Sequence, residues 1–297
     1  NEIGIKVFGT SAKYISELER LKIEPKKLSS FPSLRSILST GSPLSEEGFD
    51  YIYKSWKADV QLSSISGGTD IISCFALGNP MLPVYKGELQ SLGLGMKVES
   101  FNDEGESVID QQGELVCSQA FPSMPISFWN DDDGYKYHEA YFNTFKGIWH
   151  HGDYIKILNH GGIKIYGRSD ATLNPGGVRI GTSEIYRVID QNEDIEDSVV
   201  VGLNIEGEEK VVLFVKLYKP IKLSTSLKNQ IKLDIRTNCS PKHVPSFIYQ
   251  APDIPYTING KKIELAVKQI LEGKSISNKD SISNSESLHF FESFKID

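Results

Sequence analysis

The chain has 297 residues, 39% hydrophobic and 24% charged, which are the proportions of an ordinary globular protein with about two domains. These values exclude a largely disordered chain, a collagen-like chain and a disulfide scaffold. The net charge of −7 argues against a nucleic-acid partner, and no stretch approaches the roughly 18 apolar residues of a membrane span.

Residues 1–90 are expected to form the end of a parallel α/β sheet, because helical and strand-like runs alternate there. The apolar spacing predicts a helix over residues 12–23, and Ser45 is the expected N-cap of a second helix. The remaining elements predicted here are strands at 34–40 and 60–65 and the second helix at 46–57.

Residues 91–168 are predicted to be β-rich, since short strand-like runs lie between Gly, Asn and Asp turns. The strands are expected at 95–101, 114–118, 154–158 and 162–166, with a hairpin turn at 159–162. This pattern favours a small antiparallel barrel or sheet.

Residues 169–275 are predicted to be a compact α+β domain, followed by a tail at 276–297. Helices are expected at 183–191, 227–237 and 261–271, and strands at 198–202, 210–217 and 246–250. The tail is rich in serine, and its aromatic end is expected to dock on the body. Residues 206–274 carry twelve Lys or Arg and seven Asp or Glu, so this domain is basic within an acidic chain, which suits a polyanionic small ligand.

The three cysteines lie far apart and form no C-x-x-C pair, so they predict free thiols rather than zinc or a redox motif. The opening residues Asn1-Glu2-Ile3-Gly4 lack the features of a signal peptide, and we expect a cytoplasmic protein. Because the first residue is not Met, we also expect that the chain is part of a longer one.

Two glycine-containing segments follow predicted strands, where open α/β sheets bind ligands. Gly41-Ser42-Pro43 allows close approach of a flat ligand. In Ser66-Gly67-Gly68-Thr69-Asp70, Thr69 can donate to a phosphate oxygen and Asp70 is a hard ligand suited to Mg²⁺. Taken alone, each segment is better explained as a plain turn.

A third segment, His150-His151-Gly152-Asp153, places a carboxylate beside a glycine. Such a carboxylate can accept hydrogen bonds from two ribose hydroxyls. The histidine pair does not predict a metal site, because adjacent side chains diverge and no third ligand is evident.

The segment 167–185, GRSDATLNPGGVRIGTSEI, resembles the hinge motif of the adenylate-forming superfamily, which includes the AMP-forming acyl-CoA synthetases. Residues 255–261, PYTINGK, match the P-x-x-x-x-G-K motif of the same superfamily. With the three segments above, five motifs follow the family's order. The resemblance implies the end of the large N-terminal domain over residues 1–168, then a small mobile C-terminal α+β lid over 169–275.

The family resemblance also implies roles for single residues. Gly41, Ser42 and Pro43 would flank adenine, Thr69 would touch the α-phosphate, and Asp70, where most members have Glu, would hold Mg²⁺. Asp153 would bind the ribose with Arg168 nearby, and Arg179 would meet phosphate. Lys261 would be the catalytic lysine of adenylation, Asp170 the hinge, and Gly177 part of the CoA channel. As alternatives, Arg168 and Asp170 form an ordinary surface pair, and Lys261 simply starts a helix.

Several segments, among them 8–15, 66–71, 256–262 and 284–288, are most similar to the branch that ligates acetoacetate to CoA. Related acetate-activating enzymes carry a Trp at the position of Gly67, so Gly67 and Gly68 would open an acyl pocket. ATP, acetoacetate and CoA are therefore the expected small-molecule partners. Alternatives are another short or medium acid, or a truncated non-catalytic nucleotide- or CoA-binding module.

The phosphate loop of the superfamily, a Ser/Thr/Gly-rich segment that ends in Lys, has no counterpart in the sequence, and no Walker-type loop replaces it. It is expected in an N-terminal part of the same protein, upstream of these residues. Alone, residues 1–297 are expected to be weak or inactive in adenylation.

Overall fold

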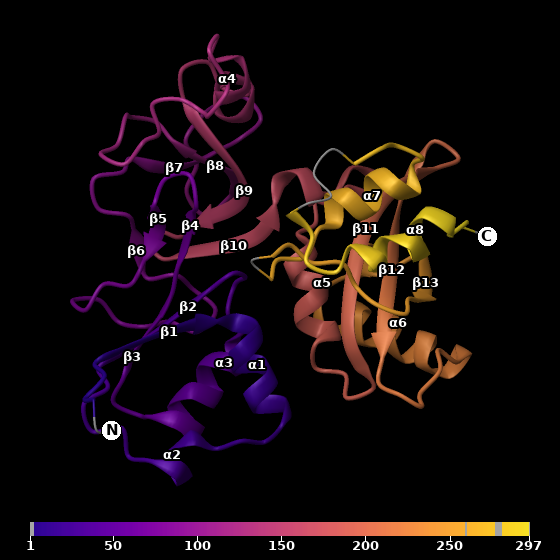
Figure 1. Cartoon of the computed structure of the whole chain (residues 1–297), viewed down its shortest axis with the longest axis horizontal. Coiled ribbons are helices and arrows are strands. Elements are labelled where there is room, and N and C mark those ends of the chain that lie inside the picture. Colours follow the sequence, from indigo (N-terminus) through magenta and orange to yellow (C-terminus); the bar gives the residue numbers. More distant parts are fainter. Residues whose placement is uncertain (1–2, 259, 277–280, 297) are drawn as a thin grey trace. The chain divides into compact units, whose positions relative to one another are not determined.

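The computed structural model describes residues 3–258, 260–276 and 281–296. The chain divides into two compact units, Asn1–Ile165 and Tyr166–Asp297 (Figure 1). This division lies three residues before the boundary expected at residue 168. Within the described ranges, no helix has the length and apolar character that crossing a membrane requires.

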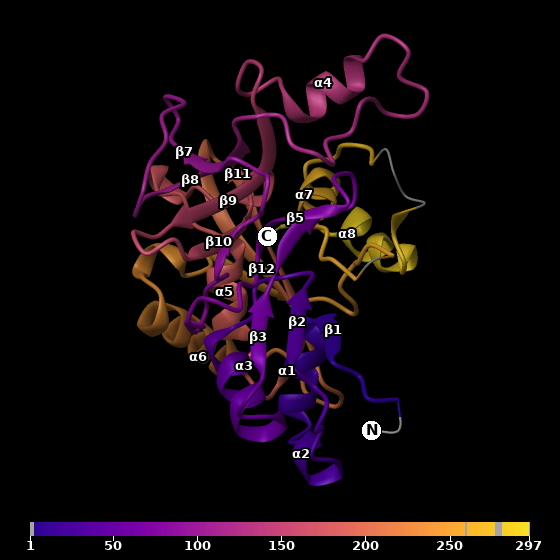
Figure 2. The same cartoon turned by 90° about the vertical axis from the view of Figure 1, so that its left-hand side faces the viewer.

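The first unit begins with a parallel three-stranded sheet of order β1-β2-β3 (Figure 2). Its strands are β1 (Val7–Ser11), β2 (Ser36–Thr40) and β3 (Gln61–Ser64). Its helices are α1 (Ala12–Arg20), α2 (Pro25–Leu28) and α3 (Glu46–Tyr51), the last continued by a π-helical turn at Ile52–Trp56. The predicted parallel α/β arrangement is confirmed.

Local capping and core packing explain these elements. The Oγ of Ser45 accepts a hydrogen bond from the Gly48 amide and so caps α3 as predicted. Ile15 of α1, Ile37 of β2 and Phe49 of α3 are completely buried in one hydrophobic core.

The rest of the first unit is antiparallel. One sheet has the order β4-β5-β6, and a second has the order β10-β9-β8-β7. The strands are β4 (Ser66–Gly68), β5 (Ser73–Leu77), β6 (Ser91–Leu92), β7 (Val98–Phe101), β8 (Gln112–Cys117), β9 (Trp149–Ile157) and β10 (Ile163–Arg168). Helix α4 (Tyr135–Tyr141) precedes β9.

These two antiparallel sheets enclose a single core, to which Phe75 of β5, Leu115 of β8 and Trp149 of β9 all belong. A bridge between Leu89 and Ile163 also joins them. Residues 66–90, which we expected to belong to the α/β part, therefore pack with the β-rich part. Their apolar side chains face the core of that part, a long-range choice that strand periodicity alone does not encode.

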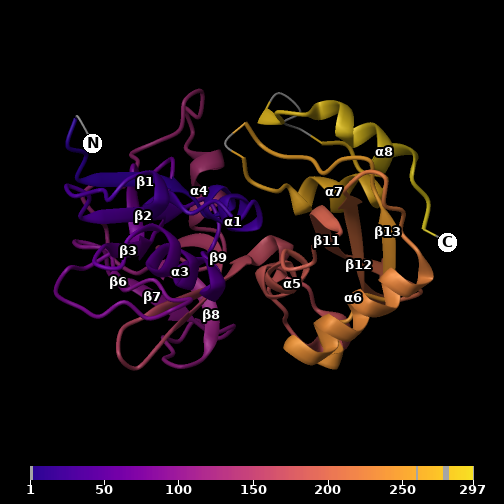
Figure 3. The same ribbon diagram turned by 90° about the horizontal axis from the view of Figure 1, so that it is seen from below.

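The second unit is a three-stranded sheet of order β11-β12-β13 with two helices on each face (Figure 3). The strands are β11 (Ile195–Ile205), β12 (Glu208–Leu217) and β13 (Phe247–Gln250). The helices are α5 (Thr182–Ile189), α6 (Thr225–Asn238), α7 (Glu264–Leu271) and α8 (Leu288–Ser293). Single 3₁₀ turns lie at Ser169–Ala171, Pro175–Gly177, Pro241–His243 and Ser285–Ser287.

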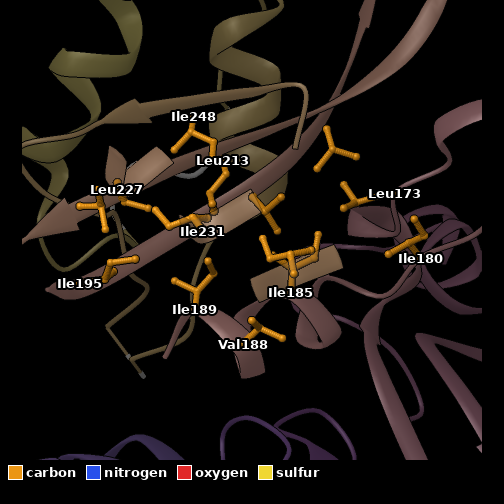
Figure 4. Packing of buried hydrophobic residues seen from close by; sticks show 14 of the residues in the cluster. Leu173, Ile180, Ile185, Val188, Ile189, Ile195, Leu213, Leu227, Ile231 and Ile248 are labelled. Atoms are coloured by element: carbon orange, nitrogen blue, oxygen red, sulfur yellow. The ribbon is translucent and has the colours of Figure 1, made fainter. Parts of the chain in front are cut away.

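Alternation along β12 supplies both cores of this unit. Leu213 (Figure 4) and Val215 belong to the core with α5 and α6, whereas Val212 and Phe214 belong to the core with α7 and α8. Because both faces of the strand are covered, it reads as an almost continuous apolar run. The predicted α+β pattern is confirmed.

The aromatic end of the tail docks on this second unit, as predicted. Leu288 and Phe291 are each only 1% exposed and belong to the core beneath α7. Upstream, Ile282 forms an antiparallel bridge with Thr257. The tail therefore lies beside the segment that precedes Lys261. Residues 277–280 and 297 of the predicted tail lie outside the described ranges.

Candidate functional site

The first candidate segment directly follows β2. Gly41 has φ +89°, a left-handed conformation that favours glycine. Ser42 is exposed, and Pro43 is half-buried just before the cap of α3. The strand-to-helix turn thus presents its backbone to solvent at the carboxyl end of the sheet.

The second segment begins in β4, where Gly67 is closely packed. A Cβ at Gly67 would lie 2.0 Å from the backbone oxygen of Ser73 on β5. A larger side chain therefore requires the β4–β5 pairing to move. This geometry corrects the simple view that a Trp here would just fill an open acyl pocket.

Gly68 lies under the ring of His151. A Cβ at Gly68 would be 2.8 Å from the ring carbon Cε1 of His151. That ring also meets Phe75 edge-on, with centroids 4.7 Å apart. The glycine permits the imidazole of β9 to lie directly against the β4 backbone.

Asp70 follows in an exposed turn, and its carboxylate accepts a hydrogen bond from the Tyr141 hydroxyl. Tyr141 in turn stacks on Trp149, with ring centroids 3.6 Å apart and planes 14° from parallel. Because Trp149 is 1% exposed in the β-rich core, the stack fixes the tyrosine that contacts Asp70. The sequence reasoning did not identify Tyr141.

Asp153 lies on β9 and is largely buried, with 13% of its side chain exposed. Its Oδ2 lies 3.8 Å from Nε2 of His151. His150 instead contacts Glu114 of β8, with Nε2 and Oε2 3.0 Å apart. The two histidines thus diverge as predicted, and His151 connects the surroundings of Gly68 to Asp153.

In the part that the structure describes, the first unit offers few side chains that could bind a divalent cation. No cluster of three or more His, Cys, Asp or Glu side chains with metal-binding geometry occurs among the described residues. The exposed Asp70 carboxylate supplies hard oxygen, and Mg²⁺ commonly binds one or two carboxylates together with substrate phosphates. Asp70 therefore fits a Mg²⁺ ion that arrives with a nucleotide.

In the second unit, Arg168 and Asp170 form a partly exposed ion pair. The Nε of Arg168 lies 3.6 Å from Oδ1 of Asp170, and about half of each side chain is exposed. Thr172 donates its hydroxyl hydrogen to the Arg168 carbonyl. The surface pair considered as an alternative is present, and exposed pairs of this kind contribute little to stability.

The glycine pair that follows is open to solvent on one side. Gly176 and Gly177 have φ +60° and +79°. A Cβ at Gly176 would lie 2.9 Å from Nζ of Lys242, whereas a Cβ at Gly177 would have no neighbour within 4 Å. Arg179 is exposed next to Ile180, which bridges back to Leu173 and closes the loop.

Lys261 lies in a hairpin loop and not in a helix. Its amide donates to Oγ1 of Thr257 at 3.1 Å, and its carbonyl accepts from the Thr257 amide at 2.8 Å. Gly260 has φ +72° in the same turn. Since α7 begins at Glu264, the alternative that Lys261 merely starts a helix is wrong, and its exposed side chain extends from a closed turn.

The neighbouring Lys262 has the opposite environment. Only 18% of its side chain is exposed, and its ammonium lies 3.0 Å from Oδ1 of Asp197 on β11. It also donates to the carbonyl of Ser198 at 2.7 Å. Tyr256 donates its hydroxyl to Oδ2 of the same aspartate at 2.6 Å.

Below this cluster, the hydroxyl of Tyr186 forms a 3.0 Å hydrogen bond with Oε1 of Glu264. Burial raises the pKa of Glu264 above its usual range, and burial followed by the nearby Glu264 charge raises the pKa of Tyr186. The ammonium of Lys262 lies 4.1 Å above the Tyr186 ring centroid. Tyr186 therefore contacts Glu264 through its hydroxyl and Lys262 through its ring.

Comparison with known proteins gives consistent relatives, although no family model matches the chain. The chain is 52% identical over 285 residues to the acetoacetyl-coenzyme A synthetase of Rhizobium meliloti, covering 96% of the chain. It is 49% identical over 294 residues to the acetoacetyl-CoA synthetase of Gallus gallus, covering 98% of the chain. In both cases it spans 44% of the relative's length.

A solved structure gives the same result. The acetoacetyl-CoA synthetase of Streptomyces lividans superposes with a TM-score of 0.91 and 41% identity. The match covers 98% of this chain and 45% of that one. The sequence resemblance and the mixed α/β fold of the adenylate-forming enzymes are thereby confirmed for these residues.

Proposed function

We propose that this chain, a homologue of the acetoacetyl-CoA synthetases along nearly its whole length, is part of an AMP-forming acetoacetate–CoA ligase. It supplies residues that bind the nucleotide and CoA, and it carries the catalytic lysine. The chain spans less than half of those relatives. The complete reaction is therefore assigned to the complete gene product.

The proposed reaction has two steps. An oxygen of the acetoacetate carboxylate attacks the α-phosphorus of ATP, and pyrophosphate leaves with its bonding electron pair. The CoA thiolate then attacks the acyl carbon of the adenylate, and AMP leaves with the former carboxylate oxygen. Both steps develop negative charge, so placed cations and oriented donors are the main catalytic requirement.

In the first unit, the proposal assigns nucleotide contacts to the strand ends. The turn Gly41-Ser42-Pro43 would lie along the adenine, where the bare backbone of Gly41 allows close approach. Thr69 would donate to the α-phosphate, and Asp153 would accept hydrogen bonds from the ribose hydroxyls. The location of Asp153 on a β-strand of the rigid core supports the last role, because a fixed acceptor loses little entropy on binding.

The proposal gives Asp70 the role of holding Mg²⁺ with the ATP phosphates. The ion would supply positive charge that offsets the charge developing on the phosphates. The Tyr141 hydroxyl, held by its stack on Trp149, would orient the carboxylate. Gly68 stays the candidate for the acyl pocket, and Gly67 is assigned there through its backbone only, because β5 encloses it.

In the second unit, Lys261 would bridge the attacking carboxylate and the α-phosphate during adenylation. A flexible ammonium on a closed turn suits a contact made in one step and released in the next. Arg168 and Arg179 would contact the nucleotide, and Asp170 would be the hinge between steps. Gly177 would line the CoA channel; the open space at its Cβ position supports this role.

The observation that carries the proposal is the combination of 46–52% identity to named acetoacetyl-CoA synthetases with an exposed Lys261 in a closed turn. The test is pyrophosphate release by the complete gene product with acetate, acetoacetate and butyrate. Acetoacetate is expected to give the highest kcat/KM. A higher kcat/KM for either other acid would contradict the substrate assignment, and no pyrophosphate with any acid would contradict ligase activity.

A further inference from the structure

Two neighbouring lysines of one motif, Lys261 and Lys262, have different environments. Lys261 is exposed, whereas the Lys262 ammonium is enclosed by Asp197, the Ser198 carbonyl and the Tyr186 ring. A buried ion pair often contributes no net stability compared with apolar residues of similar volume. What such a pair does contribute is geometry, because it fixes the relative positions of the groups that it joins.

The direction fixed here is that of the loop carrying Lys261. Tyr256 and Lys262 are bridge partners at the two ends of this loop. Each binds a different oxygen of Asp197, Tyr256 through Oδ2 at 2.6 Å and Lys262 through Oδ1 at 3.0 Å. One carboxylate on β11 thus holds both arms of the loop on the sheet.

We propose that Asp197, Tyr256 and Lys262, here named the Asp197 clamp, are positioning residues that hold the Lys261 loop in the geometry required for adenylation. This inference rests on the proposed function. Lys261 itself would touch substrate, and the clamp acts through it. A displacement of about 1 Å of a reacting group can reduce a rate about 10²-fold. A clamp at the base of the loop can therefore control the rate of adenylation through the position of Lys261.

The clamp is selective because the two steps differ in their use of Lys261. Adenylation requires the ammonium at the carboxylate and phosphate. Attack of CoA thiolate on a preformed adenylate does not require it there. Loss of the clamp should therefore slow the first half-reaction and leave the second half-reaction nearly unchanged, whereas general loss of folding would reduce both.

The experiment compares Lys262→Met, which keeps much of the side-chain volume, with the exposed Lys295→Met as matched control, in the complete gene product. Adenylation is measured by acetoacetate-dependent exchange of labelled pyrophosphate into ATP. Thioester formation is measured from synthetic acetoacetyl-adenylate and CoA. Lys262→Met should lower kcat/KM for exchange about 10- to 100-fold and change thioester formation less than about twofold.

Lys262→Arg should restore part of the exchange activity, and Lys295→Met should match the wild type. Equal loss in both half-reactions, or unchanged exchange, would overturn the proposal. If Lys262→Met does not fold, Tyr256→Phe decides by the same ratio, because it removes one hydroxyl and keeps the ring. Exchange of the Lys261 amide hydrogen with solvent should also accelerate in the clamp variants.

Pyrophosphate exchange by the wild type separates the proposed function from the clamp. If the wild type shows no acetoacetate-dependent exchange of pyrophosphate, the proposed function fails irrespective of the clamp. If the wild type is active but Lys262→Met leaves pyrophosphate exchange unchanged, only the clamp fails.

Discussion

Truncating Phe291 to alanine tests whether the tail is an integral part of the second unit. The side chain is 1% exposed and meets Phe214 of β12 edge-on, with centroids 5.1 Å apart. Removing a fully buried Phe costs about 3–5 kcal/mol through lost transfer energy and the remaining cavity. For a unit of this size, that loss corresponds to a fall in melting temperature of roughly 10–20 °C.

Urea denaturation followed by hydrogen exchange of β12 peptides measures the second unit alone. Phe290, the neighbouring residue on α8, is only partly buried, so Phe290→Ala is the matched control and should cost less than half as much. A loss below about 1 kcal/mol for Phe291→Ala, or equal losses for the two variants, would refute the inference that the tail completes this core.

Three further predictions concern the site and its support. Lys261→Met should lower pyrophosphate exchange about 10²-fold or more while attack of CoA on a supplied adenylate persists; equal loss in both assays would contradict its role. Gly177→Val should slow thioester formation at least about tenfold but spare exchange, because a side chain would enter the proposed channel; unchanged CoA kinetics would remove Gly177 from it. Burial raises the pKa of Asp253, but hydrogen bonds from Asn284 and Lys216 lower it by a larger amount. The pKa of Asp253 is therefore below its ordinary 3.8. The stabilisation is therefore present above pH 3.8 and is lost as the pH falls through the folded-state pKa. Asp253→Asn should be less stable than the wild type in urea at pH 7, and the difference should shrink toward pH 2; a difference independent of pH would contradict this.

Local chemistry made several elements predictable. Ser45 predicts the start of α3, and its hydroxyl accepts the expected capping hydrogen bond. The alternating apolar residues before and after 159–162 predict the β9–β10 hairpin, which the Leu158 and Gly162 backbones close. These features depend on residues near one another in sequence, so a single sequence contains the needed information.

Other elements depend on long-range partners and escaped prediction. Helix α4 has no fully buried residue, and only one short aromatic pair of it, Tyr137 and Tyr141, packs on the β-rich core. Its start depends on Asp131, which accepts hydrogen bonds from the Lys136 and Tyr137 amides. Strand β11 begins at Ile195, before the start predicted at residue 198, because Asp197, at a bulge, interrupts the apolar pattern.

The candidate site shows the same division. Family motifs located Thr69, Asp153 and Lys261 in the sequence. The side chains that contact or support such residues, Tyr141 beside Asp70 and Asp197 beneath the Lys261 loop, carry no local signal. Folding brings them there from 71 and from 59 or more residues away.

Oxygen-isotope transfer tests the central claim, which is ligation through an acyl-adenylate, most directly. The complete gene product is incubated with ATP, CoA and acetoacetate labelled with ¹⁸O in the carboxylate, and AMP is analysed by mass spectrometry. One ¹⁸O atom is expected in the phosphate of AMP for each thioester formed. Formation of ADP with ¹⁸O in inorganic phosphate, or thioester accompanied by unlabelled AMP, would contradict it.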